Sequence, residues 1–184
     1  MVRIILSTLV LILITACATE SEIEIFNDTE NSVSFVLGDR IYHLLPADPP
    51  AAQTFYVNSY ILFSETLKVP FILEGQVFLE SKEKVFRIKA NVNKKYHITF
   101  DRAGLQISNP SVYTISAVYL RREGDDDWGD SIIEEPIYSE NISSVLSVEP
   151  DFNYIKITDS FGSEFQEEAL DLQVGETTIY IFGL

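Results

Sequence analysis

Four carboxylates stand around the only tryptophan of the chain, and they form its densest group of residues able to do chemistry. Asp125, Asp126 and Asp127 are consecutive, Trp128 follows, and Asp130 lies two positions further on. Calcium takes six to eight oxygen ligands, and adjacent carboxylates on one loop can supply several of them. Counted from Asp125, however, the twelfth position is not the glutamate that an EF-hand requires. The cluster is therefore either a calcium-dependent ligand site or a solvated hairpin tip whose charges discourage edge-to-edge association.

Trp128 has two possible roles inside this acidic tip. Its ring could stack on a sugar or anchor a protein partner. Alternatively, the ring folds back over the end of the domain and donates its N–H to a backbone carbonyl. Large aromatic side chains serve mostly in packing, so the second role is the expected one.

Cys17 is the only cysteine, and its position suggests a modification rather than a disulfide or a thiolate metal site. It follows Arg3 and an uncharged apolar run from Ile4 to Ile14. This run is shorter than the ~20 residues that cross a bilayer as a helix, but it fits the apolar region of a secretory signal peptide. Residues 1–16 are therefore set aside from the folded protein.

The residues Ile14-Thr15-Ala16-Cys17 resemble the lipobox of bacterial lipoproteins, in which an aliphatic residue and two small ones precede the modified cysteine. The resemblance implies cleavage between Ala16 and Cys17 and acyl chains on Cys17, which anchor the protein in a membrane. The alternative is an ordinary signal peptide followed by a chance cysteine. Where lipoproteins are sorted by the next residue, Ala18 implies the outer membrane rather than the inner one.

The composition excludes several other classes of protein. The 184 residues include 28 acidic and 13 basic ones, giving a net charge of −15, which argues against binding of nucleic acid. It also predicts repulsion from anionic lipid headgroups, so that only acyl chains would hold the body at a membrane. Two histidines leave little material for a His-based metal centre, and no nucleophile motif is present. We therefore expect no enzyme, no catalytic residues and no cofactor.

The chain after Cys17 alternates between apolar and polar residues with the period of two that indicates β-strands. We expect an all-β fold with antiparallel β-sandwich architecture, two small β modules and at most one or two short helices. Strands are predicted over residues 22–25, 33–35, 85–89, 96–101, 154–158 and 177–182. Turns are predicted at residues 91–93, 101–104, 159–162 and 174–176.

In two segments the sequence is compatible with a short helix as well as with a strand. Residues 56–67 place aromatic and leucine side chains at helical spacing, and residues 163–170 begin with a capping-box pattern. Residues 104–110 contain a glycine and a proline and could connect two modules, over 17–107 and 108–184. One continuous domain with strands mixed between the halves is the alternative.

The C-terminal stretch 112–184 resembles small β-sandwich modules of bacterial cell-envelope proteins. The resemblance rests on Ser116-Ala-Val-Tyr-Leu120, Asp127-Trp-Gly-Asp130, and Tyr154-Ile-Lys-Ile-Thr-Asp159 with Gly162. It implies a fold and brings no catalytic residues. The sequence thus predicts a lipid-anchored envelope protein with a non-catalytic role in binding or structure, whose partner is an envelope protein or a glycan. The alternatives are a surface adhesin using the 125–130 tip and an accessory subunit recognised through a strand edge.

Overall fold

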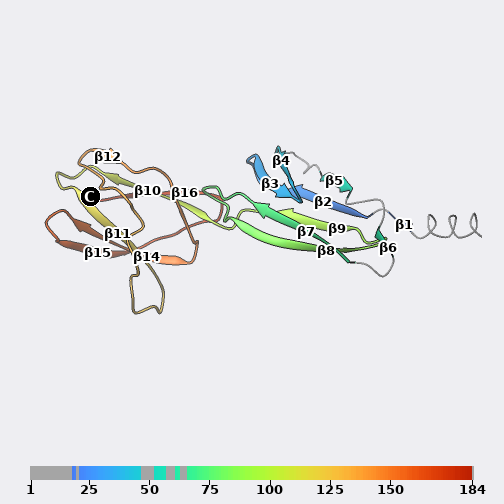
Figure 1. Cartoon of the computed structure of the whole chain (residues 1–184). Coiled ribbons are helices and arrows are strands. Elements are labelled where there is room, and N and C mark those ends of the chain that lie inside the picture. Colours follow the sequence, from blue (N-terminus) through green and yellow to red (C-terminus); the bar gives the residue numbers. More distant parts are fainter. Residues whose placement is uncertain (1–17, 20, 47–51, 57–60, 63–65, 184) are drawn as a thin grey trace, which may run out of the picture. The chain divides into compact units, whose positions relative to one another are not determined.

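The computed structural model describes residues 18–19, 21–46, 52–56, 61–62 and 66–183 (Figure 1). The predicted signal segment, Ala16 and Cys17 lie outside these residues, so their assignment stays a prediction. Within the described part, all regular elements are strands, and no helix is long and apolar enough to cross a membrane. The all-β fold predicted from the alternation is confirmed.

The strands follow one another along both halves of the chain. They are β1 (Ala18–Thr19), β2 (Glu22–Asn27), β3 (Val33–Leu37), β4 (Arg40–Leu44), β5 (Ala52–Tyr56), β6 (Ile61–Leu62), β7 (Thr66–Leu73), β8 (Lys82–Lys89), β9 (Lys94–Ile98), β10 (Ala103–Asn109), β11 (Ile115–Arg122), β12 (Asn141–Ile142), β13 (Leu146–Val148), β14 (Phe152–Asp159), β15 (Glu164–Ala169) and β16 (Thr177–Ile181). The segment 164–169 is therefore a strand and not the alternative helix. Of the other possible helix, over 56–67, only residues 56, 61–62 and 66–67 are described, and they belong to strands.

The chain divides into two compact units. Unit 1 comprises Met1–Glu74 and Ser81–Thr99, and unit 2 comprises Gly75–Glu80 and Phe100–Leu184. The boundary predicted at 107/108 falls inside β10, where Leu105 and Ile107 are both fully buried. In this division the chain passes from one unit to the other between residues 74 and 75, 80 and 81, and 99 and 100.

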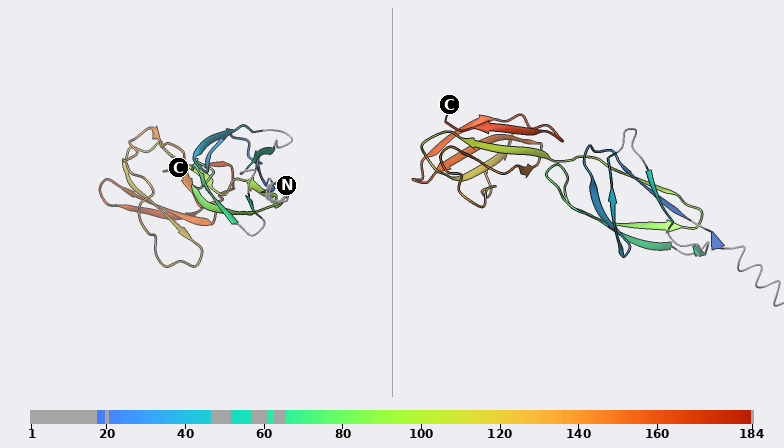
Figure 2. Two further views of the ribbon diagram at one scale, coloured as in Figure 1. Left: turned by 45° about the vertical axis from the view of Figure 1, so that its right-hand side comes forward. Right: turned by 90° about the horizontal axis from the view of Figure 1, so that it is seen from above.

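Unit 1 contains two sheets that face each other, in the orders β5-β2-β9 and β4-β3-β7-β8 (Figure 2). Phe35 on β3 meets Phe55 on β5 with ring centroids 5.7 Å apart, and Phe71 on β7 meets Tyr96 on β9 at 5.0 Å. These aromatic contacts cross from one sheet to the other, so they define the core between the sheets. A short pair, β1 with β6, adds a further ladder.

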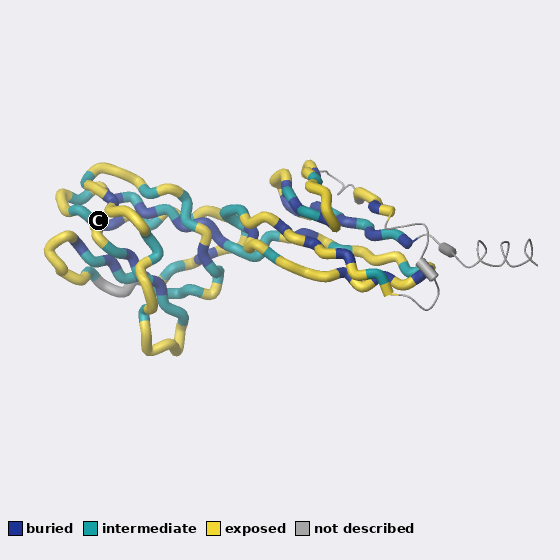
Figure 3. The backbone as a smooth tube through the Cα atoms, viewed as in Figure 1, coloured by how far each residue is buried: buried dark blue, intermediate teal, exposed yellow. Residues whose placement is uncertain are grey.

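Unit 2 is a second sandwich. One sheet has β10 at its centre, flanked by β12, β13 and β16, and the other has the order β11-β14-β15. The core is mainly aliphatic and includes Phe182, and buried residues alternate with partly buried ones over much of β10 and β14 (Figure 3). Its members from these two central strands are Ala103, Leu105 and Ile107 on β10 and Ile155 and Ile157 on β14. The predicted β-sandwich architecture is confirmed and most strand pairs are antiparallel, but β2 with β9 and β10 with β16 pair in parallel.

Most predicted strands agree with the structure, and one is displaced. The strand expected over 96–101 ends at Ile98, because the backbone then turns to residue 78: the amides of Asp101 and Arg102 both donate to the Phe78 carbonyl. The ring of Phe100 packs against that of Phe78 at 5.4 Å.

Gly104 was expected in a turn but is a buried strand position. A Cβ there would stand 2.8 Å from Thr177 Oγ1 and 2.9 Å from the Phe78 ring. The glycine therefore gives these two side chains room against the backbone of β10.

A buried asparagine at the end of β2 organises the connection that follows it in unit 1. Asn27 is 1% exposed, and its Nδ2 donates to the carbonyls of Asn31 and Leu44 at 2.7 and 3.2 Å. Its Oδ1 accepts hydrogen bonds from the backbone N and the Oγ1 of Thr29 at 3.1 and 2.7 Å. One side chain thus satisfies several backbone groups at the sandwich end.

The same arrangement recurs at the end of β10 in unit 2. Asn109 is 0% exposed, and its Nδ2 donates to the carbonyls of Tyr113 and Ile137 at 2.7 and 3.0 Å. Its Oδ1 accepts from the backbone N and the Oγ of Ser111 at 3.3 and 2.6 Å. In addition, β2 pairs in parallel with β9, the last strand of unit 1, and β10 pairs in parallel with β16, the last strand of unit 2. The two units therefore share the same arrangement of a buried asparagine and a parallel strand pair.

Candidate functional site

The acidic tip follows β11 as an exposed loop of unit 2. Asp125, Asp126, Asp127 and Asp130 are all exposed. The carboxylate of Asp127 is used within the loop, where its Oδ1 accepts from the Trp128 amide at 2.8 Å and shapes a turn. Across the described ranges, no three or more His, Cys, Asp or Glu side chains gather so that they could hold a metal ion. A calcium site here stays a prediction, tested by the change of the unfolding temperature with calcium.

Trp128 lies half-buried against the outer face of β11 and β14. Arg121 stands over its ring at 4.9 Å from the centroid, and Lys156 Nζ lies at 5.3 Å. The same two cations also stack on Tyr154 and Tyr119, which alternate with them across the strand pair. The ring therefore packs, half-buried, against a layer of cations and aromatic rings on this sheet. Among the interactions of the described residues, no hydrogen bond from its N–H to a backbone carbonyl is found.

Removal of the Trp128 ring is expected to destabilise unit 2 moderately. Trp128→Ala abolishes two cation–π contacts, each worth about 0.5–1 kcal/mol at a partly exposed site, so the loss is about 1–2 kcal/mol. Thermal unfolding followed by far-UV circular dichroism measures it. Trp128→Phe keeps a ring between Arg121 and Lys156 and should retain more than half of the stability; equal losses in both variants would contradict the stacking role.

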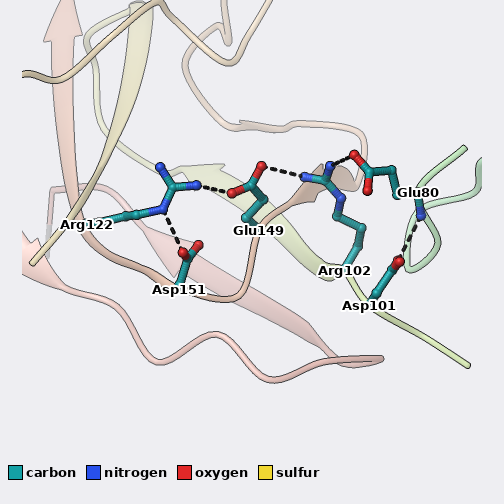
Figure 4. Close-up of polar contacts among 6 residues, drawn as sticks. All are labelled: Glu80, Asp101, Arg102, Arg122, Glu149 and Asp151. Atoms are coloured by element: carbon teal, nitrogen blue, oxygen red, sulfur yellow. Dashed lines mark hydrogen bonds and ion pairs between the residues drawn. The ribbon is translucent and has the colours of Figure 1, made fainter. Parts of the chain in front are cut away.

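A chain of ion pairs in unit 2 joins five side chains that the sequence did not bring together (Figure 4). Arg102 binds Glu80 at 2.5 Å and Glu149 at 3.3 Å. Glu149 also pairs with Arg122, whose Nε donates to Asp151 at 2.7 Å. The participants lie up to about seventy positions apart in the sequence, and their charges are mutually satisfied, which favours a structural role for the chain of ion pairs.

The hydrogen bond to Asp151 raises the pKa of Arg122 above its ordinary value, and the neighbouring Glu149 adds to the effect. A group whose pKa rises on folding stabilises the fold fully below its unfolded pKa. That contribution is lost only as the pH rises through the folded pKa. Since both values lie at the alkaline end, the pairing of Arg122 persists across neutral and acidic pH until the carboxylates themselves are protonated.

The two histidines contact different partners. His43 Nδ1 lies 2.8 Å from Ser34 Oγ, across the β3–β4 pair, and His97 Nδ1 lies 2.7 Å from Asp28 Oδ2 while its ring stacks on Phe26. Nucleophilic catalysis needs a carboxylate that orients the base beside the nucleophile. Among the described residues, the carboxylate found beside a histidine is that of Asp28, and it contacts His97 rather than His43.

A groove of about 560 Å³ in unit 2 is lined by residues between Ile132 and Leu146. Tyr138 and Ile142 on its border are 61% and 52% exposed, which is high for side chains of this type. Ser143 beside them donates from its hydroxyl to the backbone and ties the segment to β10, whose Ile107 amide it also satisfies. The groove therefore combines a fixed backbone with exposed apolar side chains, as surfaces that bind partners do.

Comparison with known proteins gives structural similarities at low sequence identity and no matching family model. No protein-family model matches the chain, and no curated protein matches it. One similar structure is the TIE protein of Bacillus anthracis, with 11% identity and a TM-score of 0.30 over 89% of this chain, which spans 33% of that protein. Another is GBS52, the minor pilin of Streptococcus agalactiae, with 7% identity and a TM-score of 0.32, covering 90% of this chain and 94% of the pilin. At these values neither similarity assigns a function.

Proposed function

We propose that this chain is an exported lipoprotein of the bacterial cell envelope, anchored by acyl chains on Cys17 and active in binding or structure rather than catalysis. One observation carries the proposal: the only cysteine of the sequence stands directly after Ile14-Thr15-Ala16, at the end of an uncharged apolar run. Two acyl chains suffice for stable anchoring, because each buried methylene contributes about 0.8 kcal/mol.

The start of the folded body supports this placement of the anchor. Ser21 and Ile23 are both 0% exposed, so packing begins four residues after Cys17. A leader that is cleaved immediately before Cys17 would leave the folded units intact. The second half of the proposal, a binding role, is supported by the groove bordered by Tyr138 and Ile142.

Cys17→Ala is expected to abolish lipid attachment. Cells that express the protein are labelled with palmitate, and the label is followed in the protein and in the membrane fraction. The wild-type chain should carry the label and sediment with membranes, whereas the variant should carry none and remain unprocessed or soluble. Thr15→Ala is the matched control, since it keeps a small residue at its position and should label normally. Label retained by the Cys17→Ala chain would refute the anchor.

The destination and display of the anchored chain are separate questions. Ala18 supports the outer membrane, and separation of inner from outer membranes on a density gradient tests this. Protease treatment of intact and lysed cells then locates the body. Loss on intact cells would place it outside and favour ligand capture, and protection until lysis would place its partner in the periplasm.

A further inference from the structure

The charge of this protein is divided unequally between its two units. Unit 2 has 18 acidic and 4 basic residues, a balance of −14, whereas unit 1 has 10 acidic and 9 basic residues, a balance of −1. Seven of the 13 basic residues lie between positions 68 and 95. The net charge of −15 therefore does not describe the surface of unit 1.

Four of these cations surround one surface hollow of unit 1, which we call the basic hollow. Its volume is about 530 Å³, and it is lined by Thr66, Lys68, Arg87, Lys89, Val92 and Lys94. The period of two along β7 and β8 sends Lys68, Arg87 and Lys89 outward while Val69, Phe86 and Ile88 point into the core. Lys94 comes from the first position of β9. The four cations are all exposed.

No carboxylate neutralises the basic hollow within the described part of the chain. The ion pairs found there include Lys95 with Glu24 but none that involves Lys68, Arg87, Lys89 or Lys94. Lys68 and Arg87 are moreover direct cross-strand partners, and like charges in such positions oppose the pairing of their strands. In a chain with 28 acidic residues, this arrangement indicates a ligand that supplies the negative charge.

The basic hollow lies at the end of unit 1 where the chain arrives from Cys17. The hydroxyl of Ser21 donates to the Lys89 carbonyl at 2.9 Å, and Ile23 pairs with Lys94 in the β2–β9 ladder. Ser21 lies four positions after Cys17, and an extended chain spans at most about 3.6 Å per residue, which limits the distance between them to about 14 Å. A lipid on Cys17 would therefore keep the basic hollow close to the membrane surface.

We propose that the basic hollow binds the phosphate groups of anionic phospholipids in the membrane that holds the anchor, so that unit 1 is oriented with this end against the bilayer. The proposal rests on the acylation of Cys17 for its biological setting. The net charge of the whole chain predicts repulsion from anionic lipids. Exposed charges farther away than a Debye length of about 10 Å are largely screened, however, so the charges nearest the bilayer determine whether the protein is attracted to it. Arg87 offers a planar fork for phosphate, and the three lysines add point charges.

The test measures partition into vesicles without the anchor. The chain of residues 17–184 carrying Cys17→Ser is mixed at 0.1 M salt with vesicles of phosphatidylcholine alone or with added phosphatidylglycerol, and sedimentation gives the bound fraction. Binding should require phosphatidylglycerol and weaken as salt rises. Each of Arg87→Gln, Lys89→Gln and Lys94→Gln should reduce partition about fivefold.

Arg40→Gln is the matched control. It removes one exposed cation of unit 1 that does not line the basic hollow. Arg40 pairs with Leu37 in the β3–β4 hairpin, and Leu37 pairs with Phe71. Phe71 lies on β7 five positions from Thr66, which does line the basic hollow. This variant should bind as the parent does. Equal partition into both vesicle types, or equal effects of Arg40→Gln and Lys89→Gln, would overturn the proposal. Binding of inorganic phosphate without binding of vesicles would also overturn it and assign the basic hollow to a free anion.

Lys68→Glu separates this role from a structural one. It replaces a like-charged cross-strand pair by an opposite one, so the unfolding temperature should rise by about 2–4 °C while vesicle binding falls more than fivefold. A loss of both stability and binding would show that Lys68 serves the fold instead. Because no variant in this test carries acyl chains, failure of vesicle binding and failure of palmitate labelling are separate results.

Discussion

Asn109→Ala is expected to lower the free energy of unfolding of unit 2 by about 3–5 kcal/mol. The asparagine is 0% exposed, and its side chain bonds to the carbonyls of Tyr113 and Ile137 and to both donors of Ser111. Alanine would take one donor from each carbonyl, which leaves the Ile137 carbonyl with the Ile115 amide at 3.0 Å and the Tyr113 carbonyl with the Ser111 hydroxyl at 3.4 Å. It would also remove the acceptor of both Ser111 donors. Each of the four lost hydrogen bonds contributes about 0.5–1.5 kcal/mol.

Urea unfolding followed by tryptophan fluorescence measures this loss, since Trp128 is the only tryptophan and lies in unit 2. Asn141→Ala is the control, because Asn141 is also an asparagine of unit 2 at a strand but is exposed. It should change the free energy of unfolding by less than about 0.5 kcal/mol. Similar effects of the two variants would show that Asn109 does not organise the sandwich end. Asn27→Ala tests the same device in unit 1.

Phe71→Ala is expected to lower the free energy of unfolding of unit 1 by about 3–5 kcal/mol. Phe71 is 0% exposed, and its ring lies 5.4 Å from those of Phe35 and Phe86 and 5.0 Å from that of Tyr96. It therefore joins both sheets of the unit. Alanine removes three aromatic contacts and leaves a cavity between sheets that cannot collapse far.

The next residue on the same strand provides the control. Ile72 is 41% exposed because the alternation of β7 turns it outward, so Ile72→Ala should cost about 1 kcal/mol or less. Far-UV circular dichroism during urea unfolding compares the two variants. If both lose the same stability, the contacts of Phe71 across the two sheets do not stabilise unit 1 as the geometry implies.

The strands that could be predicted from the sequence are those in which apolar and polar residues alternate locally. Segments such as 85–89 and 154–158 alternate cleanly, and each lies within a strand. The prediction failed at Gly104, which was expected in a turn and lies in β10, and at Phe100, which was expected in a strand and lies beyond the end of β9. In both places the deciding contact is with Phe78, which lies more than twenty positions earlier.

The similarity between the two units is visible in the sequence as a repeated residue spacing, which neither composition nor turn patterns reveal. Asn27 and Asn109 each precede a hydroxyl residue by two positions and a buried aliphatic residue, Val33 or Ile115, by six. An alignment of the chain with itself would have found this spacing. The ion pairs around Arg122 and Arg102 had no such signal, because their partners come from segments whose proximity only the fold creates.

The parallel pairing of the first and last strands in each sandwich has a mechanical consequence. In unit 1 the chain enters along β2 and leaves along β9, and in unit 2 it enters β10 and ends along β16. A force that pulls such a pair apart by its outer ends acts along the strands, so the hydrogen bonds between them are sheared together rather than opened one at a time. Each sandwich should therefore resist extension more strongly than its thermal stability alone would suggest, and a pulling experiment on single molecules would record two separate ruptures.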